Sequence, residues 1–177
     1  MLRFLIISFF ALALLLLRLL DSILTRQLVE SYGDGVRELN PFVDTSSLLS
    51  IFFSPVPVVI TLGAILIFAW MINHPRGVML AYHDTGSSFS SIAAKVFLGS
   101  PLLLLAFMLV AVIQNTSIWY TGGSLWPDVI RDWKVENPLL ALISIGMILE
   151  LFFGHFFRTA VLALLRRVDD IDTGASP

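Results

Sequence analysis

Four apolar stretches divide the chain, and each is about long enough to cross a membrane. They cover residues 2–24, 48–73, 92–113 and 138–165. Because a helix rises about 1.5 Å per residue, about 20 apolar residues span the hydrocarbon core of a bilayer. The pattern predicts an all-α protein, a polytopic membrane four-helix bundle that forms one integral membrane domain over residues 1–177.

The first stretch has two interpretations. Arg3 followed by an apolar core resembles a secretory signal peptide. No pair of small residues marks a cleavage site after it, and the helical pattern continues through Arg18. We therefore expect an uncleaved anchor.

Prolines and glycines interrupt the second apolar stretch and the polar segment that follows it. Either a short interfacial helix ends near Ser54 and the span begins at Pro57, or one long helix is kinked between them, and we expect this break at the membrane surface. Residues 73–91 contain prolines, glycines and serines and are interpreted as a loop. Asn40-Pro41 and Asn137-Pro138 each predict a helix start, since Asn caps free amides and Pro fits the first turn.

The longest predicted loop, residues 114–137, holds three of the four tryptophans. Trp126, Ile130 and Trp133 recur at helical spacing, with charged residues on the other side. The pattern predicts a short interfacial amphipathic helix in this third loop, anchored by the tryptophans at the headgroup level. An aromatic-rich loop packed on the bundle is the alternative.

Composition agrees with a membrane protein and excludes several chemistries. The chain is 57% hydrophobic and 14% charged, with a mean hydropathy of +0.89, so it has too little polar surface to cover a water-soluble globule. It has no cysteine, which excludes disulfides and thiolate metal sites. The net charge is -2 and the basic residues are scattered, which argues against nucleic acid as a partner. We expect no cofactor; the expected partners are the lipid bilayer and a membrane protein or a second copy of the chain.

Four spans place both termini on one side of the membrane. The terminal side with the middle loop carries one more Lys or Arg than the other side. Since Arg166 and Arg167 close the last span, we expect the termini in the cytoplasm.

Charged residues within the predicted spans are candidates for function, because charge is costly in lipid. Arg18 and Glu150 are the candidate intramembrane ion pair. The alternative is that Arg18 snorkels outward while Glu150 is protonated or bonded to a hydroxyl. Gly146, Glu150 and Gly154 form one helical stripe, in which the glycines would let another helix pack closely.

Asp21 and Thr25 share one face of the first helix, and a glycine, Glu38, Asn40 and Pro41 follow. This D-x-x-x-T, G, E-x-N-P pattern resembles the signature of small prokaryotic membrane proteins grouped as a domain of unknown function. The resemblance covers residues 21–41. It implies a prokaryotic plasma (inner) membrane location and a polar cluster of Asp21, Thr25, Glu38 and Asn40, and it implies no reaction. The cluster could hold a cation or a water, or it could fix the loop onto the helix end.

The middle loop contains His74, His83 and Asp84, which could bind a metal. Their spacing is weak evidence, and we expect solvated loop residues and no metal centre.

Three function classes follow from this pattern. The first is a non-catalytic integral membrane protein, an accessory or assembly subunit that docks a membrane partner or itself. The second is a small oligomeric transporter or channel. The third is a membrane-embedded enzyme that uses Asp21 and Glu38. Few buried charges in four spans make a thin pore or active site, so we rank the three classes in this order.

Overall fold

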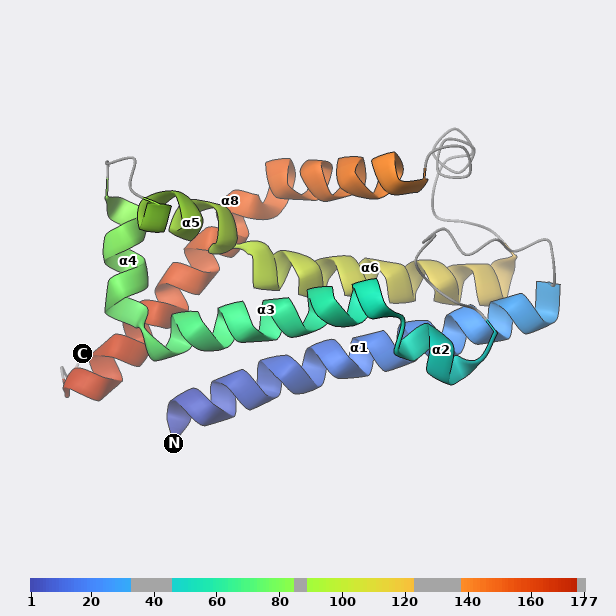
Figure 1. The fold of residues 1–177 in the computed structure, drawn as a ribbon, viewed down its shortest axis with the longest axis horizontal. Helices are drawn as coiled ribbons and strands as arrows, with labels where there is room; N and C mark the ends of the chain where they lie inside the picture. Colours follow the sequence, from blue (N-terminus) through green and yellow to red (C-terminus); the bar gives the residue numbers. More distant parts are fainter. Residues whose placement is uncertain (33–45, 85–88, 123–137, 175–177) are drawn as a thin grey trace. The chain divides into compact units, whose positions relative to one another are not determined.

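The computed structural model describes residues 1–32, 46–84, 89–122 and 138–174, and every regular element in them is an α-helix (Figure 1). In chain order these are α1 (Leu2–Tyr32), α2 (Leu48–Phe52), α3 (Pro55–Asn73), α4 (Pro75–His83), α5 (Phe89–Phe97), α6 (Ser100–Thr121) and α8 (Pro138–Thr173). The all-α prediction is confirmed for the described residues.

Three of these helices are long and apolar enough to cross a membrane. They are Leu2–Ser31 within α1, Pro55–Asn73 and Ser100–Thr121. The chain is therefore suited to a membrane, as its composition predicts. The fourth predicted span lies inside α8, where the side chains of residues 138–146 are outside the described part of the chain. The fourth crossing and the four-helix bundle stay predictions.

Helix α1 continues beyond the predicted end of the first span at residue 24 and reaches Tyr32. Polar residues replace apolar ones here without ending the helix. Arg26 and Glu30 are one turn apart and form an ion pair of 2.6 Å, an arrangement that supports an exposed helix.

The second predicted stretch is two helices, and the break supports the interpretation in which a short helix ends near Ser54. Helix α2 ends at Phe52 and α3 begins at Pro55. The Ser54 hydroxyl donates to the Ser50 carbonyl at 2.7 Å, so a polar side chain satisfies a free acceptor at the end of α2.

The predicted loop over residues 73–91 is wrong for most of its length, because it contains α4 and the start of α5. Pro75 occupies the first turn of α4, where its missing N–H costs no hydrogen bond. The third span begins at Ser100 rather than at residue 92. The Ser100 hydroxyl donates to the Phe97 carbonyl at 2.8 Å, across the joint between α5 and α6.

Helix α6 also runs further than predicted, to Thr121. Threonine and serine are weak helix formers, yet Thr116 and Thr121 each donate a hydroxyl hydrogen bond to the carbonyl four residues earlier, at 2.7 and 2.8 Å. These bonds satisfy the hydroxyls within the helix. The first residues of the predicted third loop therefore belong to α6.

The chain forms two compact units, which we describe separately. Unit 1 comprises Met1–Leu12, Leu62–Leu104 and Leu149–Pro177, and unit 2 comprises Ala13–Thr61 and Leu105–Ile148. Helices α1, α3, α6 and α8 each contribute residues to both units.

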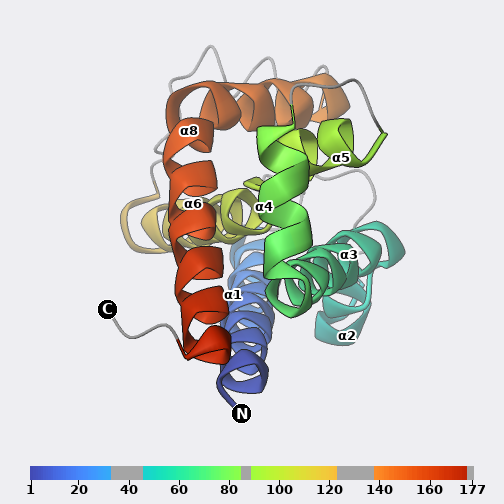
Figure 2. The same ribbon diagram turned by 90° about the vertical axis from the view of Figure 1, so that its left-hand side faces the viewer.

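Unit 1 has an apolar core with a stacked aromatic pair. The rings of Phe10 and Phe68 lie 4.1 Å apart. The other buried apolar side chains of this unit are Met71, Ile72, Val78, Ala94, Leu98, Val161, Leu165 and Val168. Helices α4 and α5 pack on each other in the same unit (Figure 2).

Unit 2 buries polar side chains together with apolar ones. Among its described residues, the buried apolar side chains are Leu14, Leu28, Ile51 and Met108. The buried polar residues in the same described part are Arg18, Ser22, Thr25, Ser54, Thr61 and Gln114. Buried polar groups need hydrogen-bond partners, and in this unit those partners define the candidate site.

Candidate functional site

Arg18 is buried in unit 2, with 5% of the residue exposed, and it binds the end of α2. Its Nη2 donates to the carbonyls of Ile51 and Phe52 at 3.0 and 2.7 Å, and its Nε donates to Phe52 at 3.2 Å. The guanidinium also lies 5.7 Å from the centre of the Phe52 ring. The last carbonyls of a helix have no partner within it and carry partial negative charge, so Arg18 acts as a C-terminal cap for α2.

Asp21 and Thr25 both accept a hydrogen bond from one amide on α6. The Asn115 Nδ2 donates to Asp21 Oδ1 at 2.9 Å and to Thr25 Oγ1 at 3.2 Å. These bonds tie α1 to α6 within unit 2. The structure thus brings together the first two members of the predicted polar cluster, and the other two, Glu38 and Asn40, lie outside the described residues.

Asn115 is a site residue that sequence reasoning missed, because residues 114–137 were predicted to form a loop. The sequence signal that could have identified it was an amide side chain next to the end of an apolar run. Only the continuation of α6 to Thr121 makes it a residue on a helix face.

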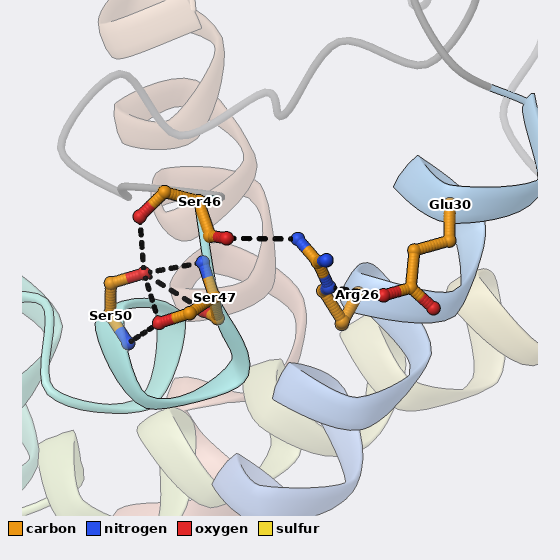
Figure 3. A network of polar contacts seen from close by, with 5 residues as sticks. All are labelled: Arg26, Glu30, Ser46, Ser47 and Ser50. Atoms are coloured by element: carbon orange, nitrogen blue, oxygen red, sulfur yellow. Dashed lines mark hydrogen bonds and ion pairs between the residues drawn. The ribbon is translucent and has the colours of Figure 1, made fainter.

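A polar network at the start of α2 connects it to the end of α1 (Figure 3). Ser47 caps α2: its hydroxyl accepts from the Ser50 amide at 3.0 Å, and the Ser50 hydroxyl accepts from the Ser47 amide at 2.8 Å. Arg26 donates to the Ser46 carbonyl at 3.1 Å and pairs with Glu30. Both ends of this five-residue helix are therefore held by arginines of α1.

Glu150 and Arg158 form an ion pair along α8 in unit 1. They are eight residues apart, and Gly154 lies between them on the same face. A Cβ atom at Gly154 would clash with the Glu150 carboxylate, so the glycine leaves the space through which the carboxylate reaches Arg158. A Cβ atom at Gly99 would lie 3.3 Å from the Arg158 Cγ, so the joint of α5 and α6 packs closely on this pair.

The sequence predicts that Gly146 and Gly154, on one stripe with Glu150, let another helix pack closely. In the structure Gly154 accommodates a side chain of its own helix. Gly154 is buried, and the surroundings of Gly146 lie outside the described residues.

The predicted ion pair between Arg18 and Glu150 stays a prediction. Arg18 belongs to unit 2 and Glu150 to unit 1, and each has the partners given above within its own unit. The predicted interfacial anchors Trp126, Ile130 and Trp133 lie outside the described residues.

Unit 1 also joins the two ends of the chain. Arg3 donates to the Asn73 carbonyl at 2.8 Å and pairs with Asp172. Arg76, in the first turn of α4, pairs with Asp169 of α8 at 2.8 Å. These contacts hold three segments of unit 1 together: the start of α1, the joint of α3 and α4, and the end of α8.

The residues considered as metal ligands are placed on α4. His74 is its N-cap, His83 its last residue and Asp84 its C-cap. The part of the chain that the structure describes contains no group of three or more side chains of the types that bind metals.

The described residues therefore show tethers between helices in unit 2 and an ion pair within α8 in unit 1. Arg18, Asp21 and Thr25 hold α2 and α6 to α1, and Glu150 and Arg158 pair along α8. Comparisons with protein family models, curated proteins and solved structures give no match to this chain.

Proposed function

We propose that the protein is a non-catalytic integral membrane protein, an accessory or assembly subunit that docks a membrane partner or a second copy through one face of α8. The observation that carries this proposal is the partial exposure of the ion pair on α8. The side chains of Glu150 and Arg158 are 38% and 28% exposed.

The surroundings of this pair are apolar. Leu151, Phe152, Phe153 and Phe156 are exposed on the same part of α8, and His155 is exposed among them. We infer that this segment lies in the membrane, as its sequence predicts. A charged side chain at the centre of a lipid-facing helix costs about 2.5–3.5 kcal/mol, and pairing removes only part of that cost. A protein surface that covers the pair avoids contact between charge and lipid.

The polar residues of unit 2 support assembly over catalysis. The Arg18 guanidinium binds backbone carbonyls, and the Asp21 carboxylate accepts from an amide. Both sets of hydrogen bonds hold neighbouring helices together. A polar cluster built in this way is expected to fail by loss of structure, not by loss of a reaction.

We further propose four crossings, a prokaryotic plasma membrane location and cytoplasmic termini. The contacts of Arg3 with Asn73 and Asp172 support an even number of crossings, since they hold the start of α1, the end of α3 and the end of α8 together. Basic residues near this place, Arg76, Arg166 and Arg167, favour the cytoplasmic side.

Site-specific photocrosslinking in native membranes tests the docking face. A photoreactive amino acid replaces Leu151 on α8, which shares a helix face with Arg158, or, as the matched control, Leu66 on α3, which is also an exposed leucine (80% and 68% exposed). We expect a discrete protein adduct from position 151 and only lipid adducts from position 66. Two epitope tags on co-expressed copies separate a second copy from a different partner.

The Glu150→Gln and Arg158→Gln double variant is expected to remove the adduct while the protein still accumulates. Lipid adducts alone from both positions would contradict the docking face.

A further inference from the structure

Helices α4 and α5 are a packed pair inserted between two candidate membrane spans. Only His74 separates the end of α3 from the start of α4, and Leu98 and Gly99 separate α5 from α6. The pair packs in unit 1, and Ser91 and Lys95 of α5 both donate to the carbonyl of Asp84 at the end of α4, at 3.0 and 2.8 Å. Chain connectivity therefore holds both helices next to the ends of two spans.

The direction of α4 differs from that of the span before it. Within unit 1, α4 turns at His74 and runs across the direction of α3, in both views of the fold (Figures 1 and 2). If α3 crosses the bilayer, a helix that runs across it lies along the membrane surface.

Among the described side chains of helix α5, one apolar set is buried and another, on the opposite face, is exposed. Ser91, Ala94 and Leu98 are buried in unit 1. The opposite face exposes Phe89 and Ile92, which are 87% and 51% exposed. Phenylalanine and isoleucine at a helical spacing of three, left uncovered beside two spans, are typical of a helix that inserts one face into the headgroup and acyl boundary.

The neighbouring helix α4 exposes polar groups. Arg76 and His83 of α4 are exposed, and Val78 between them is buried. The Lys95 ammonium donates to the Asp84 carbonyl at the end of α4, so its charge is bound there and not on the apolar face. Long basic side chains beside an apolar helix face suit the zone of phosphate groups and water.

We propose that the α4–α5 pair is an interfacial lipid-binding element: Phe89 and Ile92 insert among the acyl chains close to the headgroups, on the side of the membrane where α3 ends and α6 begins. The occupant of this face is the lipid surface. This inference does not depend on the docking face of α8, which involves other residues and a different helix.

The absence of cysteine from the native chain makes the test direct, because a single introduced cysteine carries one spin label. The full chain is placed in bilayer nanodiscs of zwitterionic and anionic phospholipid, and each label is measured for collision with oxygen, which concentrates in the bilayer, and with a water-soluble nickel chelate. The labelled variants are Phe89→Cys and Ile92→Cys. The controls are Gly77→Cys, an exposed glycine on α4 with no atom near its missing side chain, and Thr173→Cys at the exposed end of α8.

We expect the ratio of oxygen to nickel collisions at positions 89 and 92 to exceed the control ratios several-fold. Ratios equal to those of the controls would overturn the proposal, because they would place this face in water. Low collision with both reagents would overturn it as well, since it would indicate that protein covers the face. If Phe89→Cys does not accumulate, Ile92→Cys tests the same face.

Discussion

At the residue scale, Arg18 donates hydrogen bonds to backbone carbonyls, a role that its charge alone does not predict. Arg18→Met is expected to lower the free energy of unfolding by about 1–3 kcal/mol, because the carbonyls of Ile51 and Phe52 lose the guanidinium donor in a buried place. Denaturant titration in micelles, followed by circular dichroism, measures the change. Arg26→Met is the matched control, since the Arg26 side chain is 32% exposed and its loss is expected to cost less.

Asn115 is expected to couple energetically to Thr25. In a double-mutant cycle with Asn115→Ala and Thr25→Val, we expect a coupling free energy of about 0.6 kcal/mol and at most about 1.7 kcal/mol, the average and the maximum for hydrogen bonds between membrane helices. Thr116→Val supplies the control, because its hydroxyl bonds only to the Val112 carbonyl of the same helix. Coupling of Thr116 to Thr25 as large as that of Asn115 would show that the amide bridge is unimportant.

Gly154→Ala is expected to disrupt the ion pair on α8 while it leaves the helix intact. The new Cβ would occupy the space of the Glu150 carboxylate, which is the flexible end of a side chain and can move away. The coupling between Glu150 and Arg158, about 0.2–1 kcal/mol for a partly exposed pair, should then vanish. A double-mutant cycle in the native and Gly154→Ala backgrounds measures this.

Gly63→Ala is the control for the backbone effect of this substitution. No atom lies near its missing side chain, so the better helix propensity of alanine should stabilise α3 by about 0.8–1 kcal/mol. Undiminished coupling of Glu150 to Arg158 in the Gly154→Ala protein would contradict the role given to Gly154.

At the element scale, α2 depends on its cap. Five residues make too short a helix to form alone, so the capping box at Ser47 and the contact with Arg18 must hold it. We expect Ser47→Ala to cost about 1 kcal/mol and Ser47→Asp, which keeps the cap, to cost little.

The cap and the Arg18 contact should also depend on each other. Ser47→Ala combined with Arg18→Met should cost less than the sum of the single changes, because either change alone frees α2. Unfolding titrations of the three variants check this. Strictly additive costs would mean that the two ends of α2 are held independently.

At the scale of the whole molecule, the contacts of Arg3 predict the topology. Single cysteines at Gly77 and Thr173 should be labelled from the same side of the membrane, because Arg3 and Arg76 hold the adjoining segments together. A cysteine at Thr121, at the other end of the candidate span α6, should be labelled from the opposite side. A membrane-impermeant maleimide applied to intact cells measures each.

The proposed orientation adds that position 121 reacts in intact cells while positions 77 and 173 react only after the membrane is opened. The reverse pattern would overturn the orientation but keep the topology. Reaction of all three positions from one side would overturn both.

Helix content, the helix start at Pro138 and the membrane class followed from local properties. Long apolar runs cannot be covered by the polar residues of this chain, and Pro138 fits the first turn of a helix because its missing amide hydrogen costs no hydrogen bond there. The same local view failed over residues 75–83, 89–91 and 114–121, where polar residues remain helical. Their hydroxyls and charges find partners one turn away or on a neighbouring helix, and composition does not record such partners.

The candidate site was also predictable only in part from the sequence. The sequence by itself determined that Arg18, Asp21, Glu150 and Arg158 are costly in apolar surroundings and need partners. Only the tertiary structure decided which partners these four have within their units: carbonyls for Arg18, Asn115 for Asp21, and each other for Glu150 and Arg158. The physical reason is that the charge of a side chain and its position on a helix determine that it needs a hydrogen-bond partner. Which partner it has depends on the backbone or side-chain group that the fold brings within about 3 Å.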